Sequence, residues 1–306
     1  MRATRALAAR PACVLGASAL AISLLAAGIA HASAPPSAPS SPPSVQPQQP
    51  AAPQQPAAHP KAVARPVRYR VVGCRSRGQS AYLHGAYVKR VAIGFDDGPA
   101  AITPEFVRML ERNHARATFF LIGEQVGAAY RDTLLRELRD GDVLGDHSFT
   151  HPDLLRSGGA GIQLSSTLHA IHQLTGYTPC VFRPPYGAYD QSVVETARSL
   201  GLATIVWNVD PTDWALPGTQ AIEQRVLAQV QPGSIILSHD GGGPRGETLA
   251  AYPSIIAALR RRGYRIVTIP ELLDFRPVYR PCILLCDGIG VPRAEVPRDA
   301  LIERAP

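Results

Sequence analysis

From Val88 onward, short apolar runs rich in Val, Ile and Phe alternate with stretches whose apolar residues recur every three or four positions. The short runs predict strands, and the longer stretches with helical spacing predict helices. Strands are expected at 90–95, 117–122, 142–147, 180–185, 203–209, 234–239 and 264–269. Helices are expected between them, at 104–113, 131–140, 162–175, 191–200, 220–229 and 249–262.

This alternation predicts an α/β fold with about seven parallel strands. The strand runs are mostly apolar throughout, as expected where a sheet is covered on both faces or closes into a barrel. Several helices follow good starting residues, such as Thr103 and Asp190, and several end at a glycine, such as Gly141 and Gly263. The pattern therefore covers one domain, expected at 88–272.

The sequence before this domain has a different character. Three arginines in the first ten residues precede an apolar run at 12–30, and small residues then fit a cleavage site near Ala32. We predict a signal peptide over 1–32, with an uncleaved anchor as the alternative because the run is nearly long enough to span a bilayer. Residues 33–66 are mostly Pro, Ala, Ser and Gln, which predicts a disordered tether.

The cysteines outside the leader are Cys74, Cys180, Cys282 and Cys286. An even number in an exported chain predicts disulfides, which four cysteines can form in three ways. We expect a bridge from Cys74 to the Cys282/Cys286 region, since these residues flank the domain, and either a disulfide or a free buried thiol at Cys180. An N-terminal extension at 67–87 and a C-terminal tail at 273–306 complete the expected organisation, and such a bridge would link the tail to the rest of the chain.

The charge of the chain excludes one class of partner. The formal net charge of +7 includes the leader arginines, and Lys61 and Lys89 are the only lysines. No cluster of Lys and Arg interleaved with aromatic residues is present, so nucleic-acid binding is not expected. A mildly basic exported protein would be drawn to anionic surfaces such as a cell wall, although such a charge is also ordinary for a protein surface.

Polar residues fall at or near the ends of five predicted strands, where parallel barrels build their sites. They are Asp96 with Asp97, His147, Arg183, Asp210 with Asp213, and His239. Because neighbouring strand residues point to opposite sides, one carboxylate of the aspartate pair can hold a metal while the other accepts a proton. Taken alone, the same pair would also fit a solvated turn.

His147 and His151 are four residues apart, so on a helical turn they would share one face and reach the same cation. With Asp97 they form a set of two histidines and one carboxylate, which suits Zn²⁺ or another divalent ion. His169 and His172 lie within a predicted helix without a carboxylate pair, and we expect them to face solvent.

A metal at this set would lower the pKa of a bound water. Asp96 is placed to take the proton, and His239 is placed to protonate the leaving group. Asp213 would raise the pKa of His239, and Arg183 would keep Asp96 ionised. Each of these residues alone is more often structural, and their shared place at strand ends favours the catalytic interpretation.

Five motifs occur in order: FDDGP at 95–99, HSFTH at 147–151, RPPYG at 183–187, DPTDW at 210–214 and LSH at 237–239. In these motifs the chain resembles the polysaccharide deacetylase family of carbohydrate esterases, whose domain is also called the NodB homology domain. The resemblance covers roughly residues 88–272. Gly94 is a departure, because many members carry Thr there, and we expect it to alter local packing.

The resemblance implies a distorted (β/α) barrel that removes acetyl groups from N-acetylated or O-acetylated sugars. It implies a divalent metal, usually zinc, held by Asp97, His147 and His151. It implies Asp96 as the base held by Arg183, and His239 as the acid tuned by Asp213. The backbone N–H of Tyr186 would stabilise the oxyanion, and Trp214 and Leu237 would line the pocket for the acetyl methyl.

We therefore expect a secreted, cell-wall-associated, monomeric enzyme that acts on an acetylated glycan, with peptidoglycan as first choice. It would contact a membrane only if the leader stays attached. Chitin oligomers or acetylated xylan are alternative substrates, and a catalytically idle glycan-binding protein is the alternative from another class. A serine esterase is not supported because no G-x-S-x-G motif is present, and HDGGGPRGET lacks the Lys-Ser/Thr end of a phosphate loop.

Overall fold

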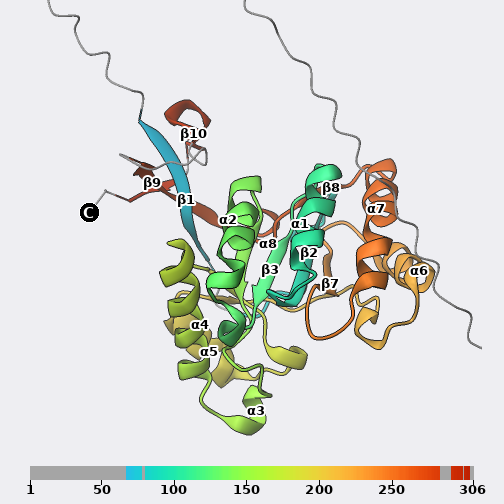
Figure 1. Ribbon diagram of the computed structural model, residues 1–306, viewed down its shortest axis with the longest axis horizontal. Coiled ribbons are helices and arrows are strands. Elements are labelled where there is room, and N and C mark those ends of the chain that lie inside the picture. The colour runs from blue at the N-terminus through green and yellow to red at the C-terminus, as the bar shows by residue number, and fades with distance from the viewer. Residues whose placement is uncertain (1–66, 78–79, 283–290, 299, 304–306) are drawn as a thin grey trace, which may run out of the picture. The chain divides into compact units, whose positions relative to one another are not determined.

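The computed structural model describes residues 67–77, 80–282, 291–298 and 300–303. The predicted signal peptide at 1–32 and tether at 33–66 lie outside the described residues. Figure 1 shows a central sheet covered by helices, with a second group of strands beside it. The described part of the chain has no helix that is both long and apolar enough to cross a membrane.

All strand pairings of the central sheet are parallel, as predicted. The strand order is β6-β5-β4-β3-β2-β7, and β8 also pairs with β2. A bridge between Val209 and Ile236 links the segment after β6 to β7, so the sheet curves round as a distorted barrel. The strands are β2 (Arg90–Gly98), β3 (Thr118–Leu121), β4 (Val143–Asp146), β5 (Val181–Phe182), β6 (Ala203–Thr204), β7 (Ile235–His239) and β8 (Arg265–Val267).

The predicted helices are confirmed to within a few residues, and short helical segments are added between them. The longer helices are α1 (Thr103–Arg112), α2 (Arg131–Asp140), α4 (Ala160–Thr175), α5 (Gln191–Ser199), α6 (Thr219–Gln229) and α7 (Gly246–Arg261). The short segments are α3 (Leu154–Ser157), α8 (Ile269–Leu272), η1 (Gly123–Gln125), η2 (Ala128–Tyr130), η3 (Pro185–Gly187), η4 (Asp213–Ala215) and η5 (Arg293–Glu295).

Apolar clusters cover both faces of the central sheet, which explains why its strands are apolar throughout. Phe119 belongs to the cluster that packs against α1 and α7, whereas its neighbour Phe120 belongs to the cluster on the other face. In the first cluster the ring of Phe95 contacts those of Phe106 and Tyr252, with ring centroids 5.0 and 4.9 Å away. The buried faces fix the sheet rigidly, and the strand ends carry the polar residues.

A second sheet joins the two extensions, in the order β10-β1-β9-β11. Its strands are β1 (Arg68–Arg75), β9 (Arg276–Cys282), β10 (Val291–Pro292) and β11 (Leu301–Ile302). β1 and β9 are antiparallel, with Arg68 opposite Cys282 and Cys74 opposite Pro277. The sequence pattern did not predict these strands.

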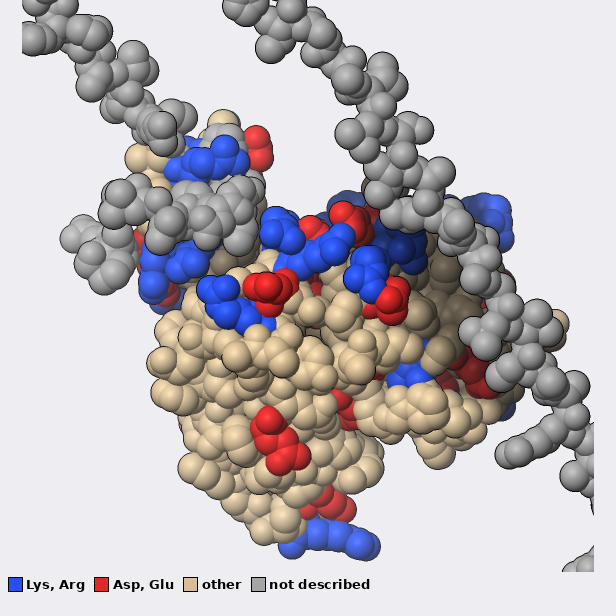
Figure 2. All heavy atoms as spheres, viewed as in Figure 1, with Lys and Arg blue, Asp and Glu red and all other residues tan. Residues whose placement is uncertain are grey.

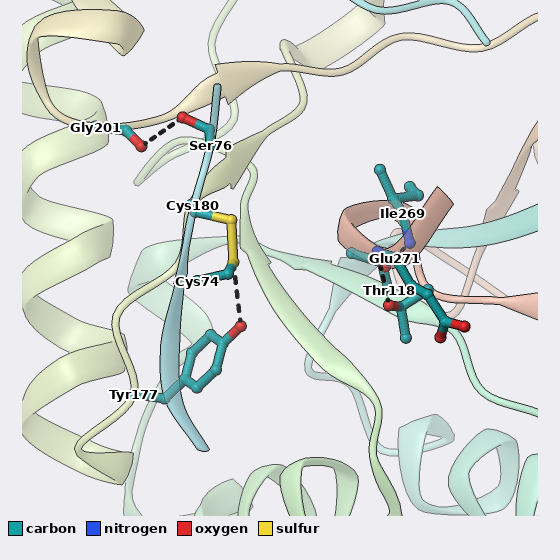
Figure 3. The surroundings of a disulfide bond; sticks show 9 residues. Cys74, Ser76, Thr118, Tyr177, Cys180, Gly201, Ile269 and Glu271 are labelled. Atoms are coloured by element: carbon teal, nitrogen blue, oxygen red, sulfur yellow. Dashed lines mark hydrogen bonds between the residues drawn. A yellow bond between two sulfur atoms is a disulfide. The ribbon is translucent and has the colours of Figure 1, made fainter. Parts of the chain in front are cut away.

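The expected bridge from Cys74 to the Cys282/Cys286 region is wrong, because Cys74 is bonded to Cys180 (Figure 3). The strand register gives the reason: Cys282 lies opposite Arg68, six residues from Cys74, which is roughly 20 Å along a strand. Thr178 donates its backbone N–H to Val72, which brings Cys180 beside β1. Cys180 is therefore not a free thiol, and Cys282 is disulfide-bonded as well.

Candidate active site

The predicted catalytic residues meet at one edge of the central sheet, because parallel strands all end on the same side. Asp96 of β2 lies opposite His239 of β7 in the strand register. His147 follows β4 directly, and Arg183 follows β5. The structure thus brings together residues that are up to 143 positions apart, and it confirms the expectation that strand ends build the site.

Asp97, His147 and His151 each offer a ligand atom within 4.8 Å of the others. Asp97 Oδ1 lies 3.4 Å from His147 Nε2 and 3.3 Å from His151 Nε2. This oxygen is buried and has no hydrogen-bond partner among the described residues. A buried carboxylate oxygen facing two imidazole nitrogens fits a divalent metal, since all three donors would otherwise be poorly satisfied.

The orientation of the His147 ring is fixed by a hydrogen bond on the side away from Asp97. Its Nδ1 donates a hydrogen bond of 2.7 Å to the backbone carbonyl of Arg183, so Nε2 keeps its lone pair toward Asp97. Burial alone would raise the pKa of Asp97, but the nearby imidazoles of His147 and His151 outweigh burial and hold the pKa well below its ordinary value. The carboxylate therefore stays ionised, as a metal ligand must be.

Two expectations about local backbone were wrong. His147 and His151 lie in a bent loop after β4 and not on a helical turn; Ser148 and His151 have φ of 63° and 57°. Asp97 has a φ of 71°, so it leaves the strand geometry that would point it away from Asp96. Both carboxylates consequently face His147, with Asp96 Oδ2 3.8 Å from its Nε2.

Asp96 forms a buried ion pair with Arg183. Arg183 Nη1 donates to Asp96 Oδ1 at 2.7 Å, and neither side chain is appreciably exposed. The guanidinium lies over the ring of Phe120, 4.3 Å from its centroid, and 5.7 Å from that of Trp207. This pairing leaves the other oxygen of Asp96 directed toward His147 and the metal ligands.

His239 and Asp213 form the second pair. Asp213 accepts hydrogen bonds from His239 Nδ1 at 2.7 Å, from the His239 backbone N–H at 2.9 Å and from Thr248 Oγ1 at 2.9 Å. Burial alone would lower the pKa of His239, but the hydrogen bond and charge of Asp213 outweigh it and raise the pKa above its usual value. This shift favours the protonated form of the imidazole, and Nε2 is left without a contact to Asp213.

The residues expected to surround the acetyl group differ in exposure. Trp214 in η4 is 56% exposed and Tyr186 in η3 is 70% exposed, so both lie at the rim, whereas Leu237 of β7 is buried. The ring of Tyr186 contacts His151, with centroids 4.8 Å apart. Tyr186 has a φ of 60°, so the RPPYG segment turns sharply beside the metal ligands.

The remaining histidines and aspartates of the sequence analysis lie where they were predicted. His169 and His172 of α4 are exposed and lie outside the metal-ligand group. Asp210 accepts the backbone N–H of Thr212 at 2.7 Å, which makes it a turn-forming residue, while Asp213 carries the contact to His239.

A glycine-rich loop after β7 supports the site, and sequence reasoning missed this role. A Cβ on Gly242 would lie 2.3 Å from Asp97 Oδ2, so only glycine leaves room for that carboxylate. The buried Arg245 shapes the loop by donating from Nε to the Gly241 carbonyl at 2.6 Å and from Nη2 to the Gly242 carbonyl at 3.1 Å. The signal was visible as HDGGGPR following the last motif.

Comparison with known proteins shows to which family the chain belongs. The family model for polysaccharide deacetylase matches residues 86–205. A peptidoglycan-N-acetylglucosamine deacetylase of Bacillus cereus is 36% identical over 196 residues, which cover 61% of this chain and 90% of that protein. The chain belongs to the polysaccharide deacetylase family. It is accordingly a hydrolase, and the family resemblance stated from the five motifs is confirmed.

Other polysaccharide deacetylases give the same result. A chitooligosaccharide deacetylase of Bradyrhizobium is 37% identical over 199 residues, covering 60% of this chain and 90% of that protein. The crystal structure of a peptidoglycan N-acetylglucosamine deacetylase in complex with a hydroxamate matches with a TM-score of 0.61 and 32% identity, covering 64% of this chain and 93% of that one. The distorted α/β barrel is thereby confirmed.

One structural relative bears on the alternative that the chain is a catalytically idle glycan-binding protein. A structure described as a CE4 family pseudoenzyme from Bacillus anthracis matches with a TM-score of 0.59 and 29% identity, covering 64% of this chain and 70% of that chain. The fold alone therefore does not distinguish an enzyme from an idle relative. In this polysaccharide deacetylase, Asp96 and Asp97 lie beside His147, and His239 is paired with Asp213.

Proposed function

We propose that this polysaccharide deacetylase is a secreted, metal-dependent enzyme that hydrolyses N-acetyl groups of cell-wall peptidoglycan. The observation that carries the proposal is the grouping at one sheet edge of a possible metal site with a base held by arginine and an acid held by aspartate. Each part alone has structural explanations, but their convergence fits hydrolysis of an amide.

A divalent ion bound by Asp97, His147 and His151, most suitably Zn²⁺, would polarise the acetyl carbonyl and lower the pKa of the attacking water. Asp96 is the group that takes the proton from this water, because its Oδ2 faces His147 while Oδ1 is held by Arg183. Arg183 holds that carboxylate in a fixed direction, as a general base requires.

His239 supplies the proton that the leaving nitrogen needs. Asp213 holds its ring through Nδ1, so the proton on Nε2 is the one delivered to the sugar amine. The backbone N–H of Tyr186, in the sharp turn beside His151, is proposed to stabilise the oxyanion that forms on the acetyl carbonyl oxygen. Leu237 and Trp214 would enclose the acetyl methyl.

Peptidoglycan is the preferred substrate because relatives named as peptidoglycan deacetylases align with most of the catalytic domain. A second candidate is a chitin oligomer, which the Bradyrhizobium relative's name supports. Acetylated xylan is a third, since a Xyl-CE4 domain is among the structural relatives, with a TM-score of 0.55. Secretion, and a position near the wall, rest on the leader-like and Pro-rich sequence before Val67.

The test is to measure acetate release from peptidoglycan, chitin oligomers and acetylated xylan. Wild-type protein, chelator-treated protein with and without added Zn²⁺, and the Asp96→Asn variant are compared. We expect release to be lost on chelation, restored by zinc, and lowered by about 100-fold or more in Asp96→Asn.

A matched control is Asp132→Asn, which changes an exposed aspartate of α2 and should leave acetate release unchanged. Release that survives both chelation and the loss of Asp96 would contradict the mechanism. If zinc binds but no glycan releases acetate, the glycan-binding alternative is favoured.

A further inference from the structure

The loop that carries His147 and His151 is held by a side chain from a different element. Gln163 lies in the first turn of α4, and its Oε1 accepts the backbone N–H of Phe149 at 2.8 Å and that of Thr150 at 2.9 Å. Its Nε2 donates to Thr150 Oγ1 at 3.0 Å. Because only the oxygen of the amide can accept two N–H groups, these bonds fix which end of the amide faces the loop. One glutamine thus makes three hydrogen bonds to the residues that lie between the two histidines.

The backbone of this loop has a conformation that needs outside support. Ser148 and His151 have φ of 63° and 57°, in the left-handed region that residues with a Cβ seldom adopt. Such a backbone persists only where its surroundings hold it. On one side η1 does so, since Gly123 donates its backbone N–H to the carbonyl of Ser148 and the next residue donates to that of Phe149, both at 2.9 Å. Gln163 holds the N–H groups on the other side.

The rings of the two histidines are held differently. The His147 ring is fixed through Nδ1 by the carbonyl of Arg183. In the part of the chain that the structure describes, no hydrogen bond reaches Nδ1 of His151, whose ring meets Asp97 through Nε2 and packs against the ring of Tyr186. The position of the His151 ring therefore depends more on the backbone just before it, which is the backbone that the glutamine holds.

Gln163 is itself on a rigid support. Its neighbour Leu164 is fully buried in the apolar cluster under α4. One turn further along the helix, Thr167 donates from Oγ1 to the Gln163 carbonyl at 3.0 Å. The same threonine packs against η1, because a Cβ on Gly123 would lie 2.5 Å from its Oγ1. α4 and η1 therefore contact each other as well as the loop, and the three segments brace one another.

The surroundings of Gln163 carry little charge. α4 contains no Lys, Arg, Asp or Glu, and Figure 2 shows mostly uncharged surface where Figure 1 places this helix. No charged residue of the helix would therefore compete for the amide group. Replacing Gln163 by an apolar residue also leaves the charge around the metal ligands unaltered, so the replacement tests geometry alone.

We propose that Gln163 is a positioning residue, which sets the place of the His151 imidazole before the metal binds. Its hydrogen bonds go to the loop and not to the reacting atoms, so it acts through the metal ligands. Removing an outer partner that orients metal ligands typically lowers metal affinity by about 10–100-fold. The proposal rests on the proposed metal site, but the two can fail separately.

Zinc affinity of the full chain is measured by competition with a fluorescent chelator. In Gln163→Leu the two N–H groups lose their acceptor, and we expect zinc to bind about tenfold or more weakly than to the wild type. Gln163→Glu keeps an oxygen that can accept both N–H groups, so its affinity should stay within about threefold of the wild type. Gln173→Leu, at an exposed position of the same helix, is the matched control and should bind zinc as the wild type does.

Hydrogen exchange of the peptide that contains residues 147–151 gives a second measurement. It is made on chelator-treated protein, so that a bound metal plays no part. The N–H groups of Phe149 and Thr150 should exchange faster in Gln163→Leu than in the wild type or Gln173→Leu. Unchanged protection of the buried strand β2 shows that each variant is folded.

Three results would overturn the proposal while leaving the metal site in place. These are wild-type zinc affinity in Gln163→Leu, an affinity in Gln163→Glu as weak as that in Gln163→Leu, or unchanged exchange of the loop in Gln163→Leu. If the wild type binds no zinc, the metal site itself fails, and the role of Gln163 fails with it. Zinc binding by the wild type that is weakened in Gln163→Leu and kept in Gln163→Glu supports both.

Discussion

The neighbours of Gly94 explain why glycine suits this position. A Cβ at this position would lie 2.5 Å from Arg183 Nη1 and 2.7 Å from Nη2. The guanidinium that holds Asp96 therefore occupies the space that a side chain at position 94 would take.

We predict that Gly94→Ala lowers kcat for acetate release by about tenfold or more, because the added methyl group displaces Arg183 from Asp96, the proposed general base. Zinc affinity should change little, since the metal ligands are elsewhere. Gly127→Ala is the control: its Cβ would meet nothing within 4 Å and its φ of −145° suits alanine. Equal activity of the two variants would show that Arg183 does not need this space.

The proton on His239 gives a pH test. Asp213 raises the pKa of His239, and an acid is active only while protonated, so activity should fall as pH rises through this pKa. Asp213→Asn removes the charge and should move the alkaline limb of kcat/KM down by about one to two pH units. Thr248→Val removes only a hydrogen bond to Asp213 and should shift the limb less. An unmoved limb in Asp213→Asn would rule out His239 as the acid.

At the scale of elements, the periodicity of the sequence was a good guide to the catalytic domain. Each predicted strand and helix exists, although β5 and β6 keep only 2 residues each of their longer apolar runs. Apolar spacing detects burial, and most residues beyond these short strands are buried, although only isolated bridges such as those of Ile205 and Val209 continue the pairing. Placing polar residues at strand ends was enough to predict that they meet at one edge of the sheet.

Loop geometry was less accessible to sequence reasoning. The positive φ values of Asp97, Ser148 and His151 come from the packing of neighbouring loops, whereas spacing rules assume regular strands and helices. The pairing of β1 with β9 was missed for a similar reason, since it joins segments about 200 residues apart and depends on contacts that local pattern does not encode. The disulfide error followed directly from that omission.

The loop at 241–243 is the element that we expect to control metal affinity. Arg245 holds two of its carbonyls, and the loop packs directly against the Asp97 carboxylate. We predict that Arg245→Lys weakens zinc binding by about 10-fold, because lysine keeps the charge but cannot hold both carbonyls in one plane.

Zinc affinity is measured by competition with a fluorescent chelator, which does not depend on turnover. Arg261→Lys, at an exposed position near the end of α7, is the matched control and should bind zinc as the wild type does. Unaltered affinity in Arg245→Lys would mean that the glycines hold the loop without the arginine.

At the scale of the whole described domain, the Cys74–Cys180 disulfide connects the two sheets across 106 residues of sequence. A hydrogen bond of 3.2 Å from Ser76 Oγ to the Gly201 carbonyl lies nearby (Figure 3). We predict that Cys74→Ala/Cys180→Ala lowers the free energy of unfolding by about 2–5 kcal/mol, because the unfolded chain regains the freedom that the bond removes.

Denaturant unfolding under non-reducing conditions measures this change, and acetate release should be retained because the bond is remote from Asp97. Ser76→Ala, which removes only the neighbouring hydrogen bond, should cost about 1 kcal/mol. A double-cysteine variant that unfolds at the wild-type denaturant concentration would show that pairing of β1 with β9 suffices to hold the extension.

The antiparallel pairing of Arg68 with Cys282 has a practical consequence. Both extensions leave the barrel on the side opposite the candidate active site. A carrier protein, dye or solid bead coupled through either extension should therefore lie on the side opposite the candidate active site. The immobilised enzyme would then present its candidate active site to an insoluble polymer. Oriented immobilisation would therefore need no change to the residues around that site.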